Sequence, residues 1–197
     1  MITVEQFVAL VEQIAAEEPK FRLGCCGDDG FCDSIGVIIG ALLRAGGAWR
    51  GLHEINYAAR KEVAKLALVS EGSLQKGEVI FRAYEPWQGG YELDRKYERD
   101  GDFYNRDLRD YYHVGVVESV FPIRIRHMAF GKMKMDTRLE KWMYHGKLKQ
   151  VDYGVKEEIK LAVPKMVEKP KEEMVSVSKK KLEEIYFLIG NLLGRSE

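Results

Sequence analysis

Residues 30–47 are the stretch that most constrains the fold of this chain. A polar, glycine-rich loop gives way at Ser34 to an almost wholly apolar run that ends at Gly46 and Gly47. Asp33 and Ser34 are residue types that begin helices, and paired glycines end them. Because apolar residues occupy every side of this predicted helix, we expect it to be buried. Ser34 would then lie at the N-terminus of a central helix, where free backbone N–H groups favour an anion.

The flanking segments predict helices first and strands later. A first helix is expected from Val4 to Ile14 with Thr3 as its cap, and a weaker amphipathic helix over residues 56–67. A turn leading into a short strand is expected within residues 74–81, strands are expected at residues 112–120 and 123–128, and two more strands within residues 132–137 and 147–153. This order is typical of an α+β fold, in which helices pack on an antiparallel sheet.

The chain is expected to form one domain with an appendage. Its 197 residues suffice for a single core, which we assign to residues 1–153. Residues 83–110 have no sustained period and are interpreted as a surface insertion, either a binding loop or lid or a tolerated insertion. Residues 154–175 are charged, contain prolines and predict a linker. Residues 176–197 predict an amphipathic helix that is too short to be stable alone and would dock or oligomerise.

Composition and charge narrow the class of protein. The net charge of +0 gives no general attraction to nucleic acid or to anionic membranes. No apolar run approaches the roughly 20 residues that cross a bilayer. Glu5 and Glu12 interrupt the N-terminal apolar pattern, which makes it a poor signal peptide. The clustered Cys25, Cys26 and Cys32 argue against a secreted disulfide framework, so we expect a protein kept in a reducing cytoplasm until release.

The histidines supply candidate bases for a nucleophile at the central helix. Such a nucleophile needs a base within hydrogen-bond reach, and the base needs an orienting group. Of four histidines, His113 begins one predicted strand and His127 lies near the end of the next. Neighbours across a hairpin lie roughly 5 Å apart, so one imidazole could take the proton while the other holds its ring. A lone histidine on a strand is more often structural, so spacing alone leaves both interpretations open.

Five short segments follow one another in a specific order. They are Phe-Arg-Leu-Gly at 21–24, Asp-Ser-Ile-Gly-Val at 33–37, Lys-Gly-Glu-Val-Ile-Phe at 76–81, His-Val-Gly-Val at 113–116 and Ile-Arg-His-Met at 125–128. In content and order they resemble the NlpC-type peptidoglycan endopeptidases, cysteine peptidases of the papain-like superfamily. The resemblance covers about residues 1–153.

The resemblance implies a papain-like fold, with N-terminal helices and a buried central helix packed on the antiparallel sheet. It implies that Ser34 stands at the nucleophile position, that His113 is the general base and acid, and that His127 orients His113. It further implies that three residues shape the substrate cleft, namely Phe21, Asp33 and Ile35. No cofactor and no metal is expected.

The function implied by the resemblance is hydrolysis of stem-peptide bonds in bacterial peptidoglycan, such as the bond between D-γ-glutamate and the diamino acid. An enzyme of this kind without a signal peptide fits a phage or prophage lysin. It would remain cytoplasmic until released and then act on the cell wall. We expect no nucleic-acid partner and no membrane partner, and a homo-oligomer could form through the C-terminal helix.

Two residues depart from the family pattern. Ile35 replaces a serine that helps to bind the amino end of the peptide, which leaves the substrate preference open. Ser34 replaces the cysteine, and a serine hydroxyl depends on His113 as base at the moment of attack. Ser34 is therefore an engineered inactivating change, a natural serine with slow hydrolysis, or the mark of a pseudoenzyme. In the last case the chain is a non-catalytic peptide-binding module or a structural component of a phage particle.

The cysteines offer two further interpretations. Cys32 lies two residues before Ser34 and could be the nucleophile if the helix began earlier. Together with a histidine, the three cysteines could also bind zinc, although their spacing differs from that of zinc knuckles. The simplest interpretation is that they are small, partly buried thiols.

Overall fold

The computed structural model describes residues 1–70 and 72–154, within a compact unit that the chain forms over Met1–Val155. The predicted C-terminal helix and, apart from Gly154, the predicted linker lie outside the described residues. Among the residues described, every helix is too short or too polar to cross a bilayer.

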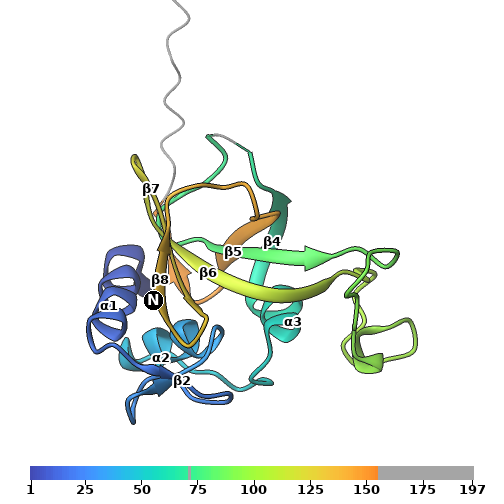
Figure 1. Cartoon of the computed structure of the whole chain (residues 1–197), viewed down its shortest axis with the longest axis horizontal. Coiled ribbons are helices and arrows are strands. Elements are labelled where there is room, and N and C mark those ends of the chain that lie inside the picture. The colour runs from blue at the N-terminus through green and yellow to red at the C-terminus, as the bar shows by residue number, and fades with distance from the viewer. Residues whose placement is uncertain (71, 155–197) are drawn as a thin grey trace, which may run out of the picture. The chain divides into compact units, whose positions relative to one another are not determined.

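A six-stranded antiparallel sheet forms the centre of the unit (Figure 1). Its strands follow the spatial order β4-β9-β5-β6-β7-β8. Their bounds are β4 Val63–Leu68, β5 Val79–Tyr84, β6 Asp110–Val120, β7 Ile123–Ala129, β8 Lys132–Asp136 and β9 Tyr144–Leu148. Two short parallel pairs complete the strands, β1 (Ile2–Thr3) with β10 (Val151–Asp152) and β2 (Lys20–Phe21) with β3 (Phe31–Cys32). The predicted α+β class is confirmed.

Helix α1 (Val4–Ala16) forms as the sequence predicts. Thr3 caps it, because the Thr3 Oγ1 atom accepts a hydrogen bond from the backbone N–H of Gln6 at 3.2 Å. Its apolar stripe is buried against helix α2 (Gly36–Arg44) and the sheet, and consists of Phe7, Val8, Val11 and Ile14. Figure 1 shows α1 and α2 next to each other beside the sheet.

Helix α2 is buried from Gly36 to Leu42, but Leu43 is 43% exposed, so burial on every side ends before the last turn. Glycine is required at two positions by close backbone approach. A Cβ atom at Gly36 would lie 1.9 Å from the carbonyl oxygen of Cys25, and one at Gly40 would lie 2.0 Å from that of Cys26. The cysteine-rich loop therefore crosses directly over α2.

The predicted helix over residues 56–67 is wrong beyond its first half. Helix α3 covers only Ile55–Tyr57, a π-helical turn continues over Ala58–Glu62, and β4 begins at Val63. Strand β4 pairs with β9, so ladder hydrogen bonds replace the helical ones. A free sheet edge thus overrides a weak local preference for helix.

The predicted insertion lies between the ends of β5 and β6, and it extends away from the helices α1 and α2 (Figure 1). It is anchored at its base. Tyr97 is fully buried and donates a hydrogen bond to Glu54 Oε2 at 2.7 Å. Arg60 donates to the carbonyl oxygens of Asp107 and Arg109 at 3.0 and 2.6 Å. These bonds fasten the insertion to the segment around α3.

Candidate active site

Ser34 lies in a turn two residues before α2, rather than at the first residue of the helix as predicted. The turn is held by Asp33. One carboxylate oxygen of Asp33 accepts from the backbone N–H of Gly36 at 2.7 Å, and the other accepts from that of Gly24 at 2.7 Å. Asp33 therefore satisfies a free donor at the helix start and joins it to the entry loop.

The Asp33 carboxylate also contacts His53, whose Nε2 atom lies 2.9 Å from Oδ2. Only 2% of Asp33 is exposed. Its oxygens are thus occupied by the loop, the helix start and His53. The predicted role of Asp33 in shaping the substrate cleft stays a prediction, and the contacts show a residue that holds the Ser34 turn in place.

His113 on β6 and His127 on β7 meet at 2.8 Å between Nε2 and Nδ1. They lie diagonally across the two strands rather than directly opposite each other. Val116 pairs with Arg126, and this register offsets His113 from His127 by two residues. Gly115 makes room between them, since a Cβ there would lie 2.9 Å from the Trp142 ring. The prediction that the hairpin brings these two histidines together is confirmed, with a register two residues different from the one expected.

The hydroxyl of Ser34 completes the group. Its Oγ atom lies 3.4 Å from His113 Nδ1 and donates to the carbonyl oxygen of Met128 at 3.0 Å. The structure therefore brings the three predicted catalytic residues into one line, with His113 between Ser34 and His127.

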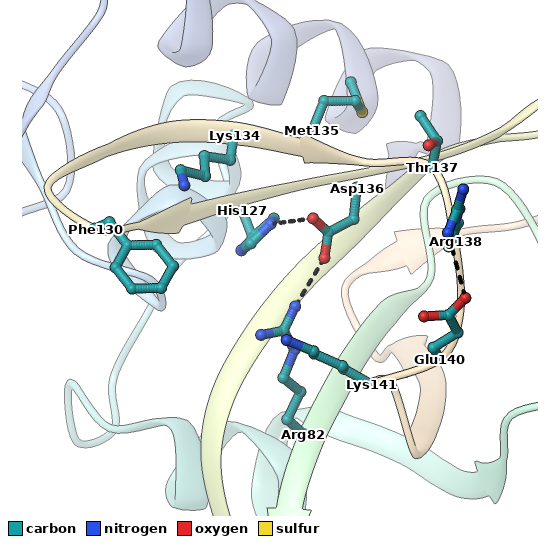
Figure 2. A pocket seen from close by; sticks show the side chains of 10 residues that line it. All are labelled: Arg82, His127, Phe130, Lys134, Met135, Asp136, Thr137, Arg138, Glu140 and Lys141. Atoms are coloured by element: carbon teal, nitrogen blue, oxygen red, sulfur yellow. Dashed lines mark hydrogen bonds and ion pairs between the residues drawn. The ribbon is translucent and has the colours of Figure 1, made fainter.

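Asp136, at the end of β8, is a functional candidate that the sequence analysis missed. Its Oδ1 atom lies 3.2 Å from His127 Nε2, a close approach without the alignment of a good hydrogen bond. Its Oδ2 atom accepts from Arg82 at 2.7 Å and from the Trp142 indole at 3.2 Å. Figure 2 shows Asp136 between His127 and Arg82.

The predicted neighbouring strands at 123–128 and 132–137 could have led to Asp136, whereas the long insertion between β5 and β6 hides the position of Arg82 from the sequence. The β7–β8 hairpin turns at Phe130 and Gly131 and pairs His127 with Lys134, which puts Asp136 on the same face two residues further along. Arg82 pairs directly with His113 across β5 and β6.

Trp142 fixes the orientation of both imidazoles. Its ring stacks on His113 with centroids 5.6 Å apart and meets His127 edge-on at 5.4 Å. The Arg82 guanidinium lies 4.4 Å from the Trp142 ring centroid. The indole therefore forms one wall of the histidine pair, and it too was missed from the sequence.

A proton count along this line favours one tautomer of His113. An ionised Asp136 can only accept, so a neutral His127 facing it carries its proton on Nε2. His127 Nδ1 is then an acceptor, and His113 must donate to it from Nε2. The remaining nitrogen, His113 Nδ1, presents its lone pair to Ser34. This is the tautomer that a general base requires.

The pKa values agree with neutral imidazoles beside an ionised acid. Burial, aided by the charges of His127 and Arg82, lowers the pKa of His113 to about 3. Burial also lowers the pKa of His127, against the opposing charge of Asp136. Burial by itself would raise the pKa of Asp136, but His127 and Arg82 more than offset this, so the net shift is downward.

Two hollows of about 360 and 400 Å³ meet over Ser34, and both are lined by Phe21, Ser34 and Tyr112. Ile35 lines the first, as do Asp33 and His53. Phe130 lines the second and is 91% exposed at the tip of the β7–β8 turn. Phe21 and Ile35 thus line the groove that crosses Ser34, where the resemblance placed the substrate cleft.

The thiols of Cys32 and Cys26 do not form an alternative nucleophilic site. Cys32 is buried, its thiol donates to the carbonyl oxygen of Asp33 at 3.4 Å, and burial raises its pKa to about 12. A nucleophilic cysteine needs the opposite shift. Cys26 lies 3.9 Å from His53 Nδ1, and burial raises its pKa to about 11. Within residues 1–70 and 72–154, no group of three or more acidic, histidine or cysteine side chains is arranged to hold a metal ion.

Comparisons with protein-family models, curated proteins and solved structures find no match to this chain.

Proposed function

We propose that this chain is a papain-like domain of the NlpC type that hydrolyses stem-peptide bonds in bacterial peptidoglycan, with serine at the position of the nucleophile. The observation that carries the proposal is the line formed by Ser34, His113 and His127 beneath an open groove. A nucleophile before a buried helix, with its base on an antiparallel sheet, also supports the papain-like comparison.

In the proposed reaction the Ser34 oxygen bonds to the carbonyl carbon of the scissile amide while its proton moves to His113 Nδ1. The carbonyl π electrons move to the oxygen to form an oxyanion. Collapse of this intermediate breaks the C–N bond, and His113 returns the proton to the leaving amine. Water, deprotonated by His113, then cleaves the acyl ester and restores Ser34.

The backbone offers donors for the oxyanion. Within the described part of the chain, the N–H groups of Ser34 and Ile35 donate no hydrogen bond. They adjoin the reacting hydroxyl and precede the N-terminus of α2, where the helix dipole favours negative charge. Such fixed donors are commonly the largest single source of transition-state stabilisation.

A second candidate function is binding of a stem peptide without cleavage. The observation that favours it is the Ser34 hydroxyl itself, which donates to Met128 at 3.0 Å and lies further from His113. Its proton is thereby directed away from the base. A thiol in the same place ionises far more readily, so the histidine pair suits cysteine better than serine.

The biological setting of the proposal rests on the sequence alone. It is that of a phage or prophage lysin that stays in the cytoplasm until release. The C-terminal helix that the sequence predicts, outside the described residues, would then serve for docking or oligomerisation.

The decisive experiment places a thiol at position 34. Ser34→Cys and Ser34→Ala chains are incubated with purified cross-linked peptidoglycan, and new amino termini are counted. We expect cleavage by Ser34→Cys and none by Ser34→Ala. Adding His113→Ala to Ser34→Cys should lower the rate by about 10²- to 10⁴-fold, as loss of a general base does.

The same experiment separates the two candidates. A folded Ser34→Cys chain that cuts nothing, while the unmodified chain binds a stem peptide saturably, would replace the peptidase with the binding module. If neither cleavage nor binding occurs, both candidates are rejected.

A further inference from the structure

We propose that a basic hollow beside the histidine pair binds a free carboxylate of a peptide ligand. The inference deepens the proposed function, on which the identity of that peptide rests. It adds a subsite on the side of His127 that faces away from Ser34 and assigns an acidic ligand to it.

The hollow has a volume of about 310 Å³ and lies along β8 and the segment that follows it (Figure 2). Its floor includes His127 and Asp136, two members of the histidine line. Its charged rim consists of Arg82, Lys134, Arg138, Glu140 and Lys141.

The charges around the hollow do not balance. Four cationic side chains face two carboxylates, whereas the whole chain has a net charge of +0. Arg82 pairs with Asp136 at 2.7 Å, and Arg138 approaches Glu140 at 3.7 Å. These two pairs use both carboxylates, which leaves an excess of two positive charges.

Lys134 and Lys141 carry that excess. Neither ammonium group has a carboxylate within 4.0 Å among the described residues. Lys134 Nζ instead lies 4.4 Å from the centroid of the exposed Phe130 ring. Two cations without a carboxylate partner in the described part of the chain, at the rim of one hollow, supply the donors that an anionic group needs.

The basic hollow adjoins the groove over Ser34. Arg82 and Phe130 line both this hollow and the one of about 400 Å³ that contains Ser34 and His113. A peptide that lies across Ser34 can therefore extend past Phe130 and place a carboxylate near Lys134 and Lys141. Stem peptides carry such carboxylates on their glutamate and at their terminus.

The proposal is tested by binding to the unmodified full-length chain, so it does not depend on catalysis. The probe is the tripeptide L-alanyl-γ-D-glutamyl-L-lysine, either as the free acid or with both carboxyl groups amidated. Affinities are measured by NMR titration of the ¹⁵N-labelled chain. We expect the free acid to bind about tenfold more tightly, which is the scale of one hydrogen bond to a charged group.

The double variant Lys134→Gln/Lys141→Gln should abolish that preference by weakening only the free acid. Its matched control is Lys65→Gln/Lys132→Gln, which removes two exposed strand lysines that do not line the hollow. The control should keep the preference unchanged.

Three results would overturn the inference. They are equal affinity for acid and amide, a preference that survives in Lys134→Gln/Lys141→Gln, and binding of glycerol 3-phosphate to the hollow when the acidic peptide does not bind. The outcome is independent of the peptidase test. A lysine-dependent preference in a chain whose Ser34→Cys variant cuts nothing supports the subsite and rejects only the hydrolase.

Discussion

Two histidine–carboxylate pairs occupy the same sheet, yet they have opposite surroundings. His127 and Asp136 lie 3.2 Å apart and line a hollow open to solvent. His145 on β9 and Glu78, one residue before β5, lie 2.7 Å apart, and both side chains are buried. Glu78 also accepts a hydrogen bond from the backbone N–H of Gln75 at 3.0 Å. The second pair fastens a turn to β9.

The difference shows that a histidine beside an acid does not make a site. His127 contacts a second imidazole, which contacts a hydroxyl under an open groove. Among the described residues, His145 contacts only Glu78 through its ring nitrogens. The first pair thus has the contacts that the proposed proton transfer requires, whereas the contacts of the second pair are with the fold.

The largest expected effect separates the two pairs by stability. Glu78→Ala removes a buried partner of His145 and should lower the free energy of unfolding by about 3–5 kcal/mol, because it strands a buried polar group. Urea denaturation measures the loss. Glu140→Ala, at an exposed acid, is the control and should change stability by less than about 0.5 kcal/mol. A loss at Glu78 no larger than at Glu140 would contradict the structural role.

Asp136→Asn should lower the rate of the proposed cleavage rather than the stability of the fold. The new amide can donate to His127 Nε2, which reverses the tautomers and turns His113 Nδ1 into a donor. In the Ser34→Cys chain we expect the cleavage rate to fall about 10- to 100-fold, less than at a carboxylate that contacts the base directly.

The ¹⁵N chemical shifts of the imidazoles give a second measurement for Asp136→Asn. They should show the His113 proton moving from Nε2 to Nδ1. An unchanged tautomer together with an unchanged rate would mean that Asp136 does not position the pair.

Acid sensitivity should map to His113, which contacts the open pair through His127. The pKa of His113 is about 3 in the folded chain, against an ordinary 6.5. Between these values the unfolded chain binds a proton that the folded chain does not, so stability falls as the pH is lowered from about 6.5 toward 3. His113→Gln should flatten this dependence by up to about 1.4 kcal/mol per pH unit.

Urea denaturation at several pH values would measure that slope. Lys65→Gln serves as a surface control and should retain the slope of the unmodified chain. A His113→Gln chain with the same slope as this control would contradict the buried, neutral state of His113.

The smallest expected effect is at Phe130. This residue has a φ of +50°, in the left-handed region, and its exposed ring lines both the basic hollow and the adjoining hollow of about 400 Å³. Phe130→Asn should raise the free energy of unfolding by about 1 kcal/mol, because asparagine tolerates this conformation better. The same variant should weaken tripeptide binding a few-fold. A loss of stability would show that the ring is a packing residue and not part of a binding surface.

Much of the fold could be predicted because its signals are local. The Thr3 cap, the stripe of α1 and the apolar run of α2 each lie within one element. The adjacency of His113 and His127 was also accessible, because a short hairpin joins their strands. The helix over residues 56–67 failed for the opposite reason, since β4 depends on β9, which lies about eighty residues later in the chain.

The sequence by itself determined a buried central helix, with Ser34 near its N-terminus and two histidines on one hairpin, since helix periodicity and hairpin pairing act over a few residues. Only the tertiary structure decided that Arg82 and Trp142 join Asp136 around the histidine pair and that the Asp33 carboxylate faces the loop. These contacts join β5, β8 and the segment before β9, whose order in the sheet differs from their order in the chain. Side chains from such strands meet only when the whole sheet has formed, so no local pattern encodes their contact.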